Sequence, residues 1–477
     1  MNAPSIQFLG FALAGAVIFN LSPSVAWRRW VVLALNLVFI TFFIPSITAA
    51  LPYAAFLAIG YVAIVALRKR PSTGLFLLFL GLLLFSFFYL KRYSFIPAGV
   101  TLPFVYSIIG LSYVFFRVLH LVIDVRQKTL IEPISPLAYL NYTLHFPALI
   151  SGPIQMYPDF KRNELEPEPL DIFTVGYAVL RIVTGFFKVV IVSVLLLKCQ
   201  ELFTADLAQA GSFTAKIGYS ALIGAIYPLF LYANFSGYTD FVVGIARLYR
   251  FRLPENFDNP FVAENFIAFW SRWHITLSTW LKTYVYTPLL MVLMRRFPSR
   301  KLEAYFGVLA YFVTFFLVGA WHGQTATFLF FGVLQGGGVA ANKLYQVAMT
   351  GWLTRKGYRA LGGNPLYRAL SRGLTFAWFA FTLLWFHLTW AQIGDLVARA
   401  GVGGFLLGWV SVWLVASALL AGLVALQNAS AKLAIAGEPI FKSRYALTVT
   451  VTAMAVATFA AVTLVAGPAP DIVYKNF

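Results

Sequence analysis

Two histidines in strongly apolar surroundings are the residues of this sequence best suited to acid–base chemistry. His322 lies in AWHGQT, inside a stretch between Glu303 and Lys343 that contains no Asp, Glu, Lys or Arg. His274 lies upstream, in FWSRWHITLSTWL (269–281). An imidazole with an ordinary pKa of about 6.5 can accept a proton from a hydroxyl at neutral pH. A histidine in an apolar run can equally be a satisfied structural residue, so residue type alone leaves both interpretations open.

The elements that must position these histidines are membrane helices. The chain is 60% hydrophobic and 11% charged, and a soluble domain carries about twice that charged fraction. A helix needs roughly 20 apolar residues to cross a bilayer, and a segment in lipid must be helical to satisfy its backbone. We therefore predict an all-α polytopic membrane protein with roughly 11–13 spanning or half-spanning segments. The apolar runs behind this prediction are 4–21, 30–48, 51–67, 74–90, 103–123, 172–198, 304–342, 373–392, 403–427 and 446–466.

The net charge of +19 does not indicate nucleic-acid binding, because the basic residues are scattered through short loops. Loop clusters of Lys and Arg mark the cytoplasmic side of a membrane protein. With ArgArg at 28–29, ArgLysArg at 68–70 and the loop 355–372 inside, the N-terminus and the tail 467–477 are both predicted to be extracytoplasmic. The first apolar run has no basic residue before it, so we expect no cleaved signal peptide.

The sequence predicts no metal site and no bound cofactor. Cys199 is the one cysteine, which excludes an intramolecular disulfide and a multi-cysteine metal site, and the five histidines are scattered singly. Neither a GxSxG nucleophile elbow nor a GxxxxGK phosphate loop is present. The three glycines 336–338 follow an apolar segment, and we interpret them as a site of close helix packing.

Polar side chains also gather in two other segments at predicted membrane depth. Arg117, His120 and Asp124 share one face of a helix, where they form either a buried network that fixes packing or the wall of a cavity. Asn234 and Asp240 precede a turn-rich stretch. Ionisable residues inside a membrane are costly, so these positions are functional candidates.

The segment 265–284, which carries His274, is strongly amphipathic at helical period. Trp273 lies on its apolar face, whereas Arg272 and Lys282 lie on its polar face. Because tryptophan favours the boundary between membrane and water, we predict a helix in or near the membrane interface.

The apolar stretch 304–342 is predicted to break at His322. As one helix it would be roughly 58 Å long, too long for one span and short for two spans with a full loop. Either the turn reaches one membrane surface with short helices, or a broken pair of helices meets inside the protein. Trp321 and Gln324 flank the histidine at this break.

These segments resemble the membrane-bound O-acyltransferases. The resemblance runs from about Gly110 to Gln346, and the bacterial members that serve alginate acetylation and lipoteichoic acid D-alanylation are the most similar. Its most specific part is FWSRWHITLSTWL followed downstream by WHG. The matching blocks are FPALISGPI (146–154), NFSGYTDFVVGIARL (234–248), RLPENFDNPFVAENFIAFWSRWHITLSTWLKTYVYTPL (252–289) and GAWHGQTATFLFFGVLQGG (319–337).

The resemblance implies one membrane-embedded domain over residues 1–477, with helices forming a ring around a central tunnel. It implies that His322 is the active-site histidine and that His274 is a second catalytic position. The residues that we expect to support the histidines or line the tunnel are Asn234, Asp240, Arg272, Trp273, Trp321 and Gln324.

The end of the chain, DIVYKNF, fits a further family feature. Similar bacterial systems end, in this protein or in a small partner, with a motif of the form apolar-apolar-Tyr-x-x-Phe. The resemblance implies that Tyr474 is an acyl relay. Val473 departs from the pattern, which often has phenylalanine before the tyrosine.

The resemblance implies O-acyl transfer across the cytoplasmic membrane of a bacterium. We expect a cytoplasmic thioester donor, acetyl-CoA, and an extracytoplasmic polysaccharide acceptor reached through a separate esterase-like transferase. Membrane lipid and a polysaccharide biosynthesis complex are the other expected partners. D-alanyl transfer, or a lipid or protein acceptor, is the alternative within the same chemistry. A transporter or flippase is the alternative of another class, with a substrate path along Arg117, His120, Asp124, Arg181 and Lys188.

Overall fold

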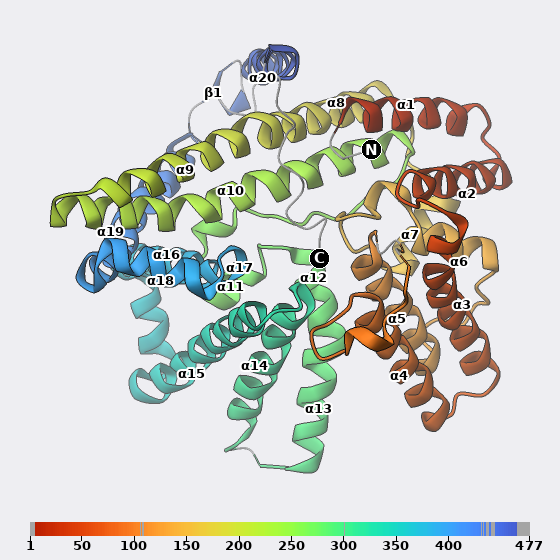
Figure 1. Ribbon diagram of the computed structural model, residues 1–477, viewed down its shortest axis with the longest axis horizontal. Coiled ribbons are helices and arrows are strands. Elements are labelled where there is room, and N and C mark those ends of the chain that lie inside the picture. The colour runs from red at the N-terminus through yellow and green to blue at the C-terminus, as the bar shows by residue number, and fades with distance from the viewer. Residues whose placement is uncertain are drawn as a thin grey trace. The chain divides into compact units, whose positions relative to one another are not determined.

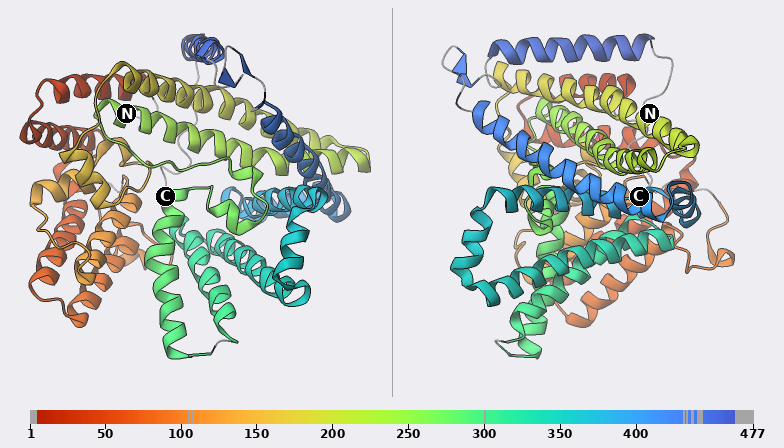
Figure 2. Two further views of the ribbon diagram at one scale, coloured as in Figure 1. Left: turned by 180° about the vertical axis from the view of Figure 1, so that it is seen from behind. Right: turned by 90° about the vertical axis from the view of Figure 1, so that its left-hand side faces the viewer.

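The regular secondary structure of the described residues is helical apart from two antiparallel strands of two residues each, β1 (Ala434–Ile435) and β2 (Glu438–Pro439) (Figures 1 and 2). This computed structural model describes residues 5–104, 106, 109–299, 301–430, 432, 434–435, 438–439 and 444–464. The expected all-α class is confirmed. Tyr474 and the rest of the predicted extracytoplasmic tail lie outside the described residues.

Seven of the described helical stretches are long and apolar enough to cross a membrane. The prediction of roughly 11–13 segments also counted half-spanning ones, and two shorter apolar helices, Ile6–Asn20 and Tyr445–Ala461, accompany the seven. The chain is therefore a multi-pass membrane protein. The seven stretches are Ile47–Lys69, Thr73–Leu90, Ile172–Gln209, Phe213–Leu248, Glu303–His322, Pro365–His387 and Val402–Ser430.

The chain divides into two compact units, each built from segments that are not contiguous in sequence. Among the described residues, the first unit comprises 5–186 and 237–255, and the second comprises 187–236 and 256–464. The helix α10 (Phe213–Leu248) contributes to both.

Serine caps begin most helices of the first unit. Ser5, Ser24, Ser46, Ser72 and Ser135 each accept a hydrogen bond at Oγ from the backbone N–H three residues later, which satisfies an otherwise unpaired donor of the first turn. The elements of this unit are α1 (Ile6–Asn20), α2 (Val25–Thr41), α3 (Ile47–Lys69), α4 (Thr73–Leu90), η1 (Ala98–Val100), α5 (Leu111–Gln127), α6 (Pro136–Thr143), η2 (Phe146–Ala148), α7 (Tyr157–Leu165) and α8 (Ile172–Phe187) up to residue 186.

The polar stripe of α5 is bonded within the first unit. The Arg117 guanidinium, 1% exposed, donates to the backbone oxygens of Thr143 (3.1 Å) and Ala148 (2.8 Å). His120 Nδ1 lies 3.0 Å from Asp124 Oδ2, and its Nε2 accepts from the Tyr157 N–H at 3.0 Å. Of the two interpretations, these contacts support a buried network that fixes packing rather than a cavity wall. Other groups of the chain form hydrogen bonds or an ion pair with each of these side chains.

The second unit holds the two histidines. Its elements are η3 (Lys188–Val192), α9 (Ser193–Gln209), the part of α10 up to residue 236, η4 (Pro260–Val262), α11 (Phe266–Trp270), α12 (Ile275–Leu281), η5 (Lys282–Tyr286), α13 (Thr287–Arg296), α14 (Glu303–His322), α15 (Ala326–Gly363), α16 (Pro365–Thr382), α17 (Leu384–His387), α18 (Trp390–Ala400), α19 (Val402–Ser430), β1, β2 and α20 (Arg444–Leu464).

The apolar stretch 304–342 breaks where the sequence predicted. The helix α14 ends at His322, and α15 begins at Ala326 after three residues. The expected shortage of length does not arise, because α15 continues to Gly363, well beyond the apolar run. The 20 residues of α14 are by themselves roughly 30 Å long, enough to span a hydrocarbon core.

Glycines allow α14 and α15 to pack backbone against backbone. A Cβ at Gly332 would lie 2.5 Å from the carbonyl oxygen of Phe316, and one at Gly336 would lie 2.5 Å from that of Phe312. Small residues permit such close approach of helices in membranes. The interpretation of the glycines 336–338 as a packing site is confirmed at Gly336 and at Gly338, where a Cβ would collide with the Trp378 ring, but it is wrong for Gly337, which has no atom within 4 Å of a Cβ.

The prediction of one continuous helix over 265–284 is wrong. The segment forms α11, a turn, α12 and then the π-helical η5. The turn falls at His274, whose backbone is left-handed with φ 43° and ψ 53°. The predicted apolar side, including Trp273 and Trp280, is nevertheless buried.

Adjacent glycines of α15 provide a test of this packing. Gly336→Ala should destabilise the detergent-solubilised protein by about 1–3 kcal/mol, because its methyl group would press on a backbone oxygen. Gly337→Ala should be neutral or stabilising by up to about 1 kcal/mol, because a Cβ there meets no atom within 4 Å and alanine favours a helix. Thermal unfolding of the two variants measures the difference, and equal stability would contradict the packing.

Candidate functional site

His322 is the last residue of α14 and is 3% exposed. Its ring centroid lies 4.5 Å from that of Trp321 and 5.2 Å from that of Phe386, with Phe331 at 6.1 Å. Gly323 follows in extended conformation and ends the helix. The break therefore places a titratable ring among aromatic side chains at the end of an apolar helix.

His274 is held in a turn by a short pairing with an earlier segment. Phe257 and Trp273 form an antiparallel bridge, the Asp258 N–H donates to the Arg272 carbonyl at 3.0 Å, and the Ile275 N–H donates to the Asn256 carbonyl at 3.0 Å. One of these hydrogen bonds involves a residue before His274, and the other involves the residue after it. Such a conformation is sparsely populated for residues other than glycine, and it clusters at functional sites when the surroundings enforce it.

The Asn256 side chain fixes the start of α12 after this turn. Asn256 is 0% exposed, and its Oδ1 accepts from the Thr276 hydroxyl at 2.6 Å and from the Thr276 N–H at 3.3 Å. Sequence reasoning did not single out Asn256. Its position in a turn-rich stretch gave no sign that it would pair with a residue 20 positions later.

The His274 ring is neutral at neutral pH. It is 1% exposed and lies edge-on to the Phe235 ring, at a centroid distance of 4.9 Å. Burial lowers the pKa of His274 to about 3, because a charged imidazolium is poorly solvated in such surroundings. A neutral imidazole can donate one hydrogen bond and accept another.

The other predicted residues of the second unit differ in their surroundings. Trp273 is 2% exposed and stacks on Phe269 at 5.6 Å, so it is part of the core. Arg272 lies 3.7 Å from the Asp258 carboxylate. Asn234 is 0% exposed, Trp321 contacts His322, and Gln324 is half-buried beside the break.

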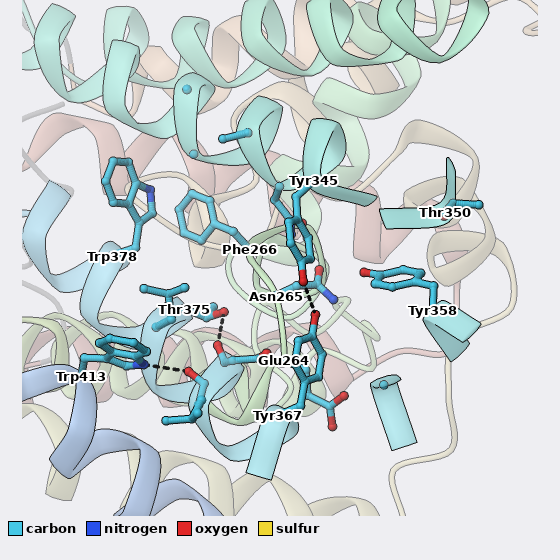
Figure 3. A pocket seen from close by; sticks show the side chains of 18 of the residues that line it. Glu264, Asn265, Phe266, Tyr345, Thr350, Tyr358, Tyr367, Thr375, Trp378 and Trp413 are labelled. Atoms are coloured by element: carbon cyan, nitrogen blue, oxygen red, sulfur yellow. Dashed lines mark hydrogen bonds between the residues drawn. The ribbon is translucent and has the colours of Figure 1, made fainter. Parts of the chain in front are cut away.

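A cavity of about 1220 Å³ lies in the second unit, between α15 and α16, beside residues 264–266 (Figure 3). His322 and its three aromatic neighbours are not among the residues that line it. The sequence gave no prediction of this cavity.

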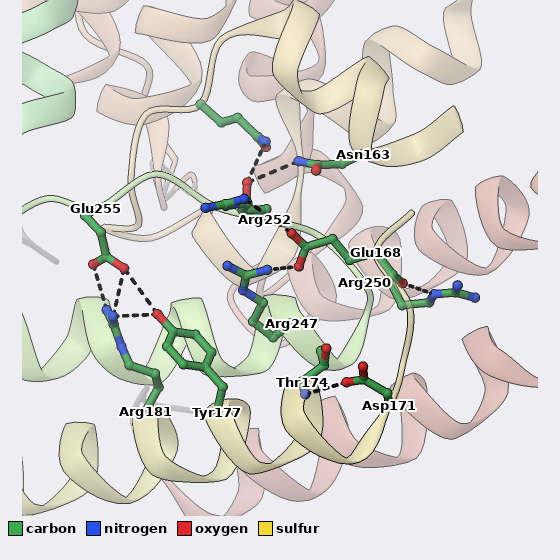
Figure 4. A network of polar contacts seen from close by, with 11 residues as sticks. Asn163, Glu168, Asp171, Thr174, Tyr177, Arg181, Arg247, Arg250, Arg252 and Glu255 are labelled. Carbon is green, nitrogen blue, oxygen red and sulfur yellow. Dashed lines mark hydrogen bonds and ion pairs between the residues drawn. The ribbon is translucent and has the colours of Figure 1, made fainter. Parts of the chain in front are cut away.

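Asp240 belongs to an ion-pair network of the first unit (Figure 4 shows its neighbours). Arg181 lies 2.8 Å from Asp240 and donates to both oxygens of Glu255, at 2.7 and 2.8 Å. The Tyr177 hydroxyl accepts from Arg181 at 2.9 Å. The structure thus assigns Asp240 a guanidinium partner, and it shows Glu255 as a member that sequence reasoning missed. The two residues of the Arg181–Glu255 pair are 74 positions apart.

His387 has structural contacts. Its ring stacks on Tyr227 at a centroid distance of 3.6 Å, and its Nδ1 lies 2.7 Å from the Leu383 carbonyl oxygen. Across the described residues, no group of three or more His, Cys, Asp or Glu side chains could hold a metal ion.

Comparison with known proteins identifies a family for the region that contains both histidines. The family model for the membrane-bound O-acyltransferase family matches residues 47–386, which include both His274 and His322. The chain is 28% identical over 236 residues to the teichoic acid D-alanyltransferase of Bacillus subtilis, covering 48% of this chain and 56% of that protein.

Two further relatives carry other names. The chain is 32% identical over 254 residues to the "Probable alginate O-acetylase AlgI" of Pseudomonas fluorescens, covering 52% of this chain and 46% of that protein. It is 32% identical over 217 residues to the peptidoglycan O-acetyltransferase of Helicobacter pylori, covering 44% of this chain and 38% of that protein. The chain thus spans about half the length of the curated relatives that it matches. With the family model matching most of its length, the chain belongs to the membrane-bound O-acyltransferase family.

Proposed function

We propose that this protein transfers an acyl group from a cytoplasmic thioester, acetyl-CoA, toward a hydroxyl of an extracytoplasmic polysaccharide. The observation that carries the proposal is His322, buried among aromatic rings at the break between α14 and α15, inside the region that matches the family. The names of the relatives support a cell-envelope acceptor, since they specify alginate, peptidoglycan and teichoic acid. Because one relative is a D-alanyltransferase, D-alanyl transfer is the second candidate.

In the proposed reaction His322 is the general base. It takes the proton of the acceptor hydroxyl as the oxygen attacks the thioester carbonyl. The carbon–sulfur bond then breaks, and His322 passes the proton to the leaving thiolate. Donors must stabilise the oxyanion that forms. The neutral ring of His274 can supply a hydrogen bond for this purpose, or it can orient the acceptor hydroxyl.

The proposal needs a path between two compartments. We place the protein in the cytoplasmic membrane of a bacterium, with both termini extracytoplasmic, from the distribution of Lys and Arg in its loops. An extracytoplasmic esterase-like transferase would then pass the acyl group to the polysaccharide. The transporter alternative loses support, because Arg117 and His120 are bonded to neighbouring groups of the chain and Arg181 is paired with Asp240 and Glu255.

Replacement of His322 tests the proposed base. His322→Ala should lower transfer of labelled acetyl from acetyl-CoA by about 10²–10⁴-fold, the usual contribution of a positioned base. The assay uses membranes that contain the partner proteins. His387→Ala is the matched control, since it removes a half-buried imidazole with structural contacts. Normal transfer by a folded His322→Ala protein would exclude His322 as the base.

Asn256 tests the role of the His274 turn. Asn256→Ala removes the side-chain bonds to Thr276 and should lower kcat about tenfold or more, because a small displacement of a catalytic group is costly. Asn36→Ala removes another fully buried asparagine, whose Oδ1 accepts from the Phe146 N–H at 2.8 Å in the first unit. We expect the two variants to lose similar stability and only Asn256→Ala to lose turnover. A loss of turnover that merely follows the melting temperature would refute the positioning role.

Tyr474 tests the proposed relay. Intact-protein mass spectrometry after incubation with acetyl-CoA should detect an acyl adduct on Tyr474, and His322→Ala should abolish it. Tyr474→Phe should lack the adduct and the transfer to polysaccharide, whereas Tyr445→Phe should retain both. Full polysaccharide acylation by Tyr474→Phe would exclude the relay.

A further inference from the structure

The cavity between α15 and α16 has a basic end. Arg355 and Arg359 line it, both side chains are exposed, and no carboxylate among the described residues is ion-paired with either. Glu264, the acidic residue of the cavity lining, is already bonded to Arg368 at 2.6 Å and to Arg372 at 2.7 Å. The free positive charge at this end therefore favours an anion.

A strained residue begins the basic end. Thr354 has φ 64° and ψ 167° inside α15, where the helix kinks. This conformation is nearly restricted to glycine, and a β-branched residue adopts it only when its surroundings enforce it. The kink separates the basic part of α15 from the long apolar part that lines the rest of the cavity.

The remainder of the cavity is mostly apolar and aromatic. Val333, Leu334, Leu374 and Trp378 line it (Figure 3 shows the aromatic and polar side chains). Gly337 also lines it, and a Cβ there would meet no atom within 4 Å, so this position faces open space.

The dimensions match a membrane lipid. From Val333 to Thr350 the cavity follows α15 for roughly 25 Å at 1.5 Å per residue. One leaflet with its headgroups is roughly 20–23 Å thick. The volume of about 1220 Å³ exceeds the usual 300–1,000 Å³ or so of small-molecule pockets.

We propose that this cavity binds a membrane phospholipid with an anionic headgroup. Its phosphate lies at Arg355 and Arg359, which can each bind two phosphate oxygens, and its acyl chains lie along Val333, Leu374 and Trp378. Neither His322 nor His274 lines this cavity, so this inference does not depend on the proposed function.

A glycine pair on α15 tests the apolar end. The full-length protein in neutral detergent is titrated with phosphatidylglycerol brominated on its acyl chains. The quenching of Trp378 fluorescence is obtained by subtracting the fluorescence of the Trp378→Phe version of each protein from that of the protein itself. Gly337→Leu fills the open space and should weaken binding at least tenfold. Gly351→Leu, on the same helix and also without a neighbour within 4 Å of a Cβ, lies outside the cavity lining and should bind as the wild type does.

A charge series tests the basic end. Arg355→Gln with Arg359→Gln should weaken binding of brominated phosphatidylglycerol about tenfold, to the level of brominated phosphatidylcholine. Lys356→Gln removes an adjacent charge that does not line the cavity and should have little effect. Thermal unfolding of each variant verifies that it is folded.

Several outcomes would overturn the proposal. They are equal binding of the two lipids by the wild type, unchanged binding by folded Gly337→Leu, and displacement of the lipid by soluble glycerol phosphate alone. Displacement by acetyl-CoA would instead identify the cavity as a donor site.

Discussion

The second unit depends on the direct backbone contact between α14 and α15. Gly332 and Gly336 bring α15 against the carbonyl oxygens of Phe316 and Phe312, and this approach allows the chain to reverse in three residues after His322. Larger side chains at these glycines would separate the helices. A wider separation would require a longer connection and would withdraw the aromatic side chains that enclose the histidine. The position of the proposed base is therefore set by residues that take no part in chemistry.

Apolar periodicity predicted much of this fold because it reports the environment of each segment. The runs of apolar residues correspond to helices, and the break at His322 lies where the polar residues interrupt the longest run. The helical wheel also identified the buried side of residues 265–284, including Trp273 and Trp280. It failed at His274, because the turn there is produced by pairing with residues 256–258, which no local pattern contains.

The site could be predicted only in part for the same reason. Two histidines in a recognisable sequence context identified candidates, whereas the bonds of Asn256 to Thr276 and of Arg181 to Glu255 join residues far apart in the chain. The cavity was not foreseen either, since residues from several separate segments line it, and Gly337 leaves open space there. The charge of residues 355–372 indicated only that Arg355 and Arg359 face water or headgroups. The loop expected there is wrong, because both arginines lie within α15 and α16 begins at Pro365.

The left-handed backbone at His274 places the proposed catalytic role of this residue in conflict with local stability. Glycine or asparagine would adopt φ 43° with less strain than histidine does, so the chain retains a residue that is locally unfavourable. Selection of variants for heat resistance alone would tend to replace this imidazole. Because the proposed reaction uses this imidazole, laboratory evolution for stability would have to select for turnover at the same time in order to retain it.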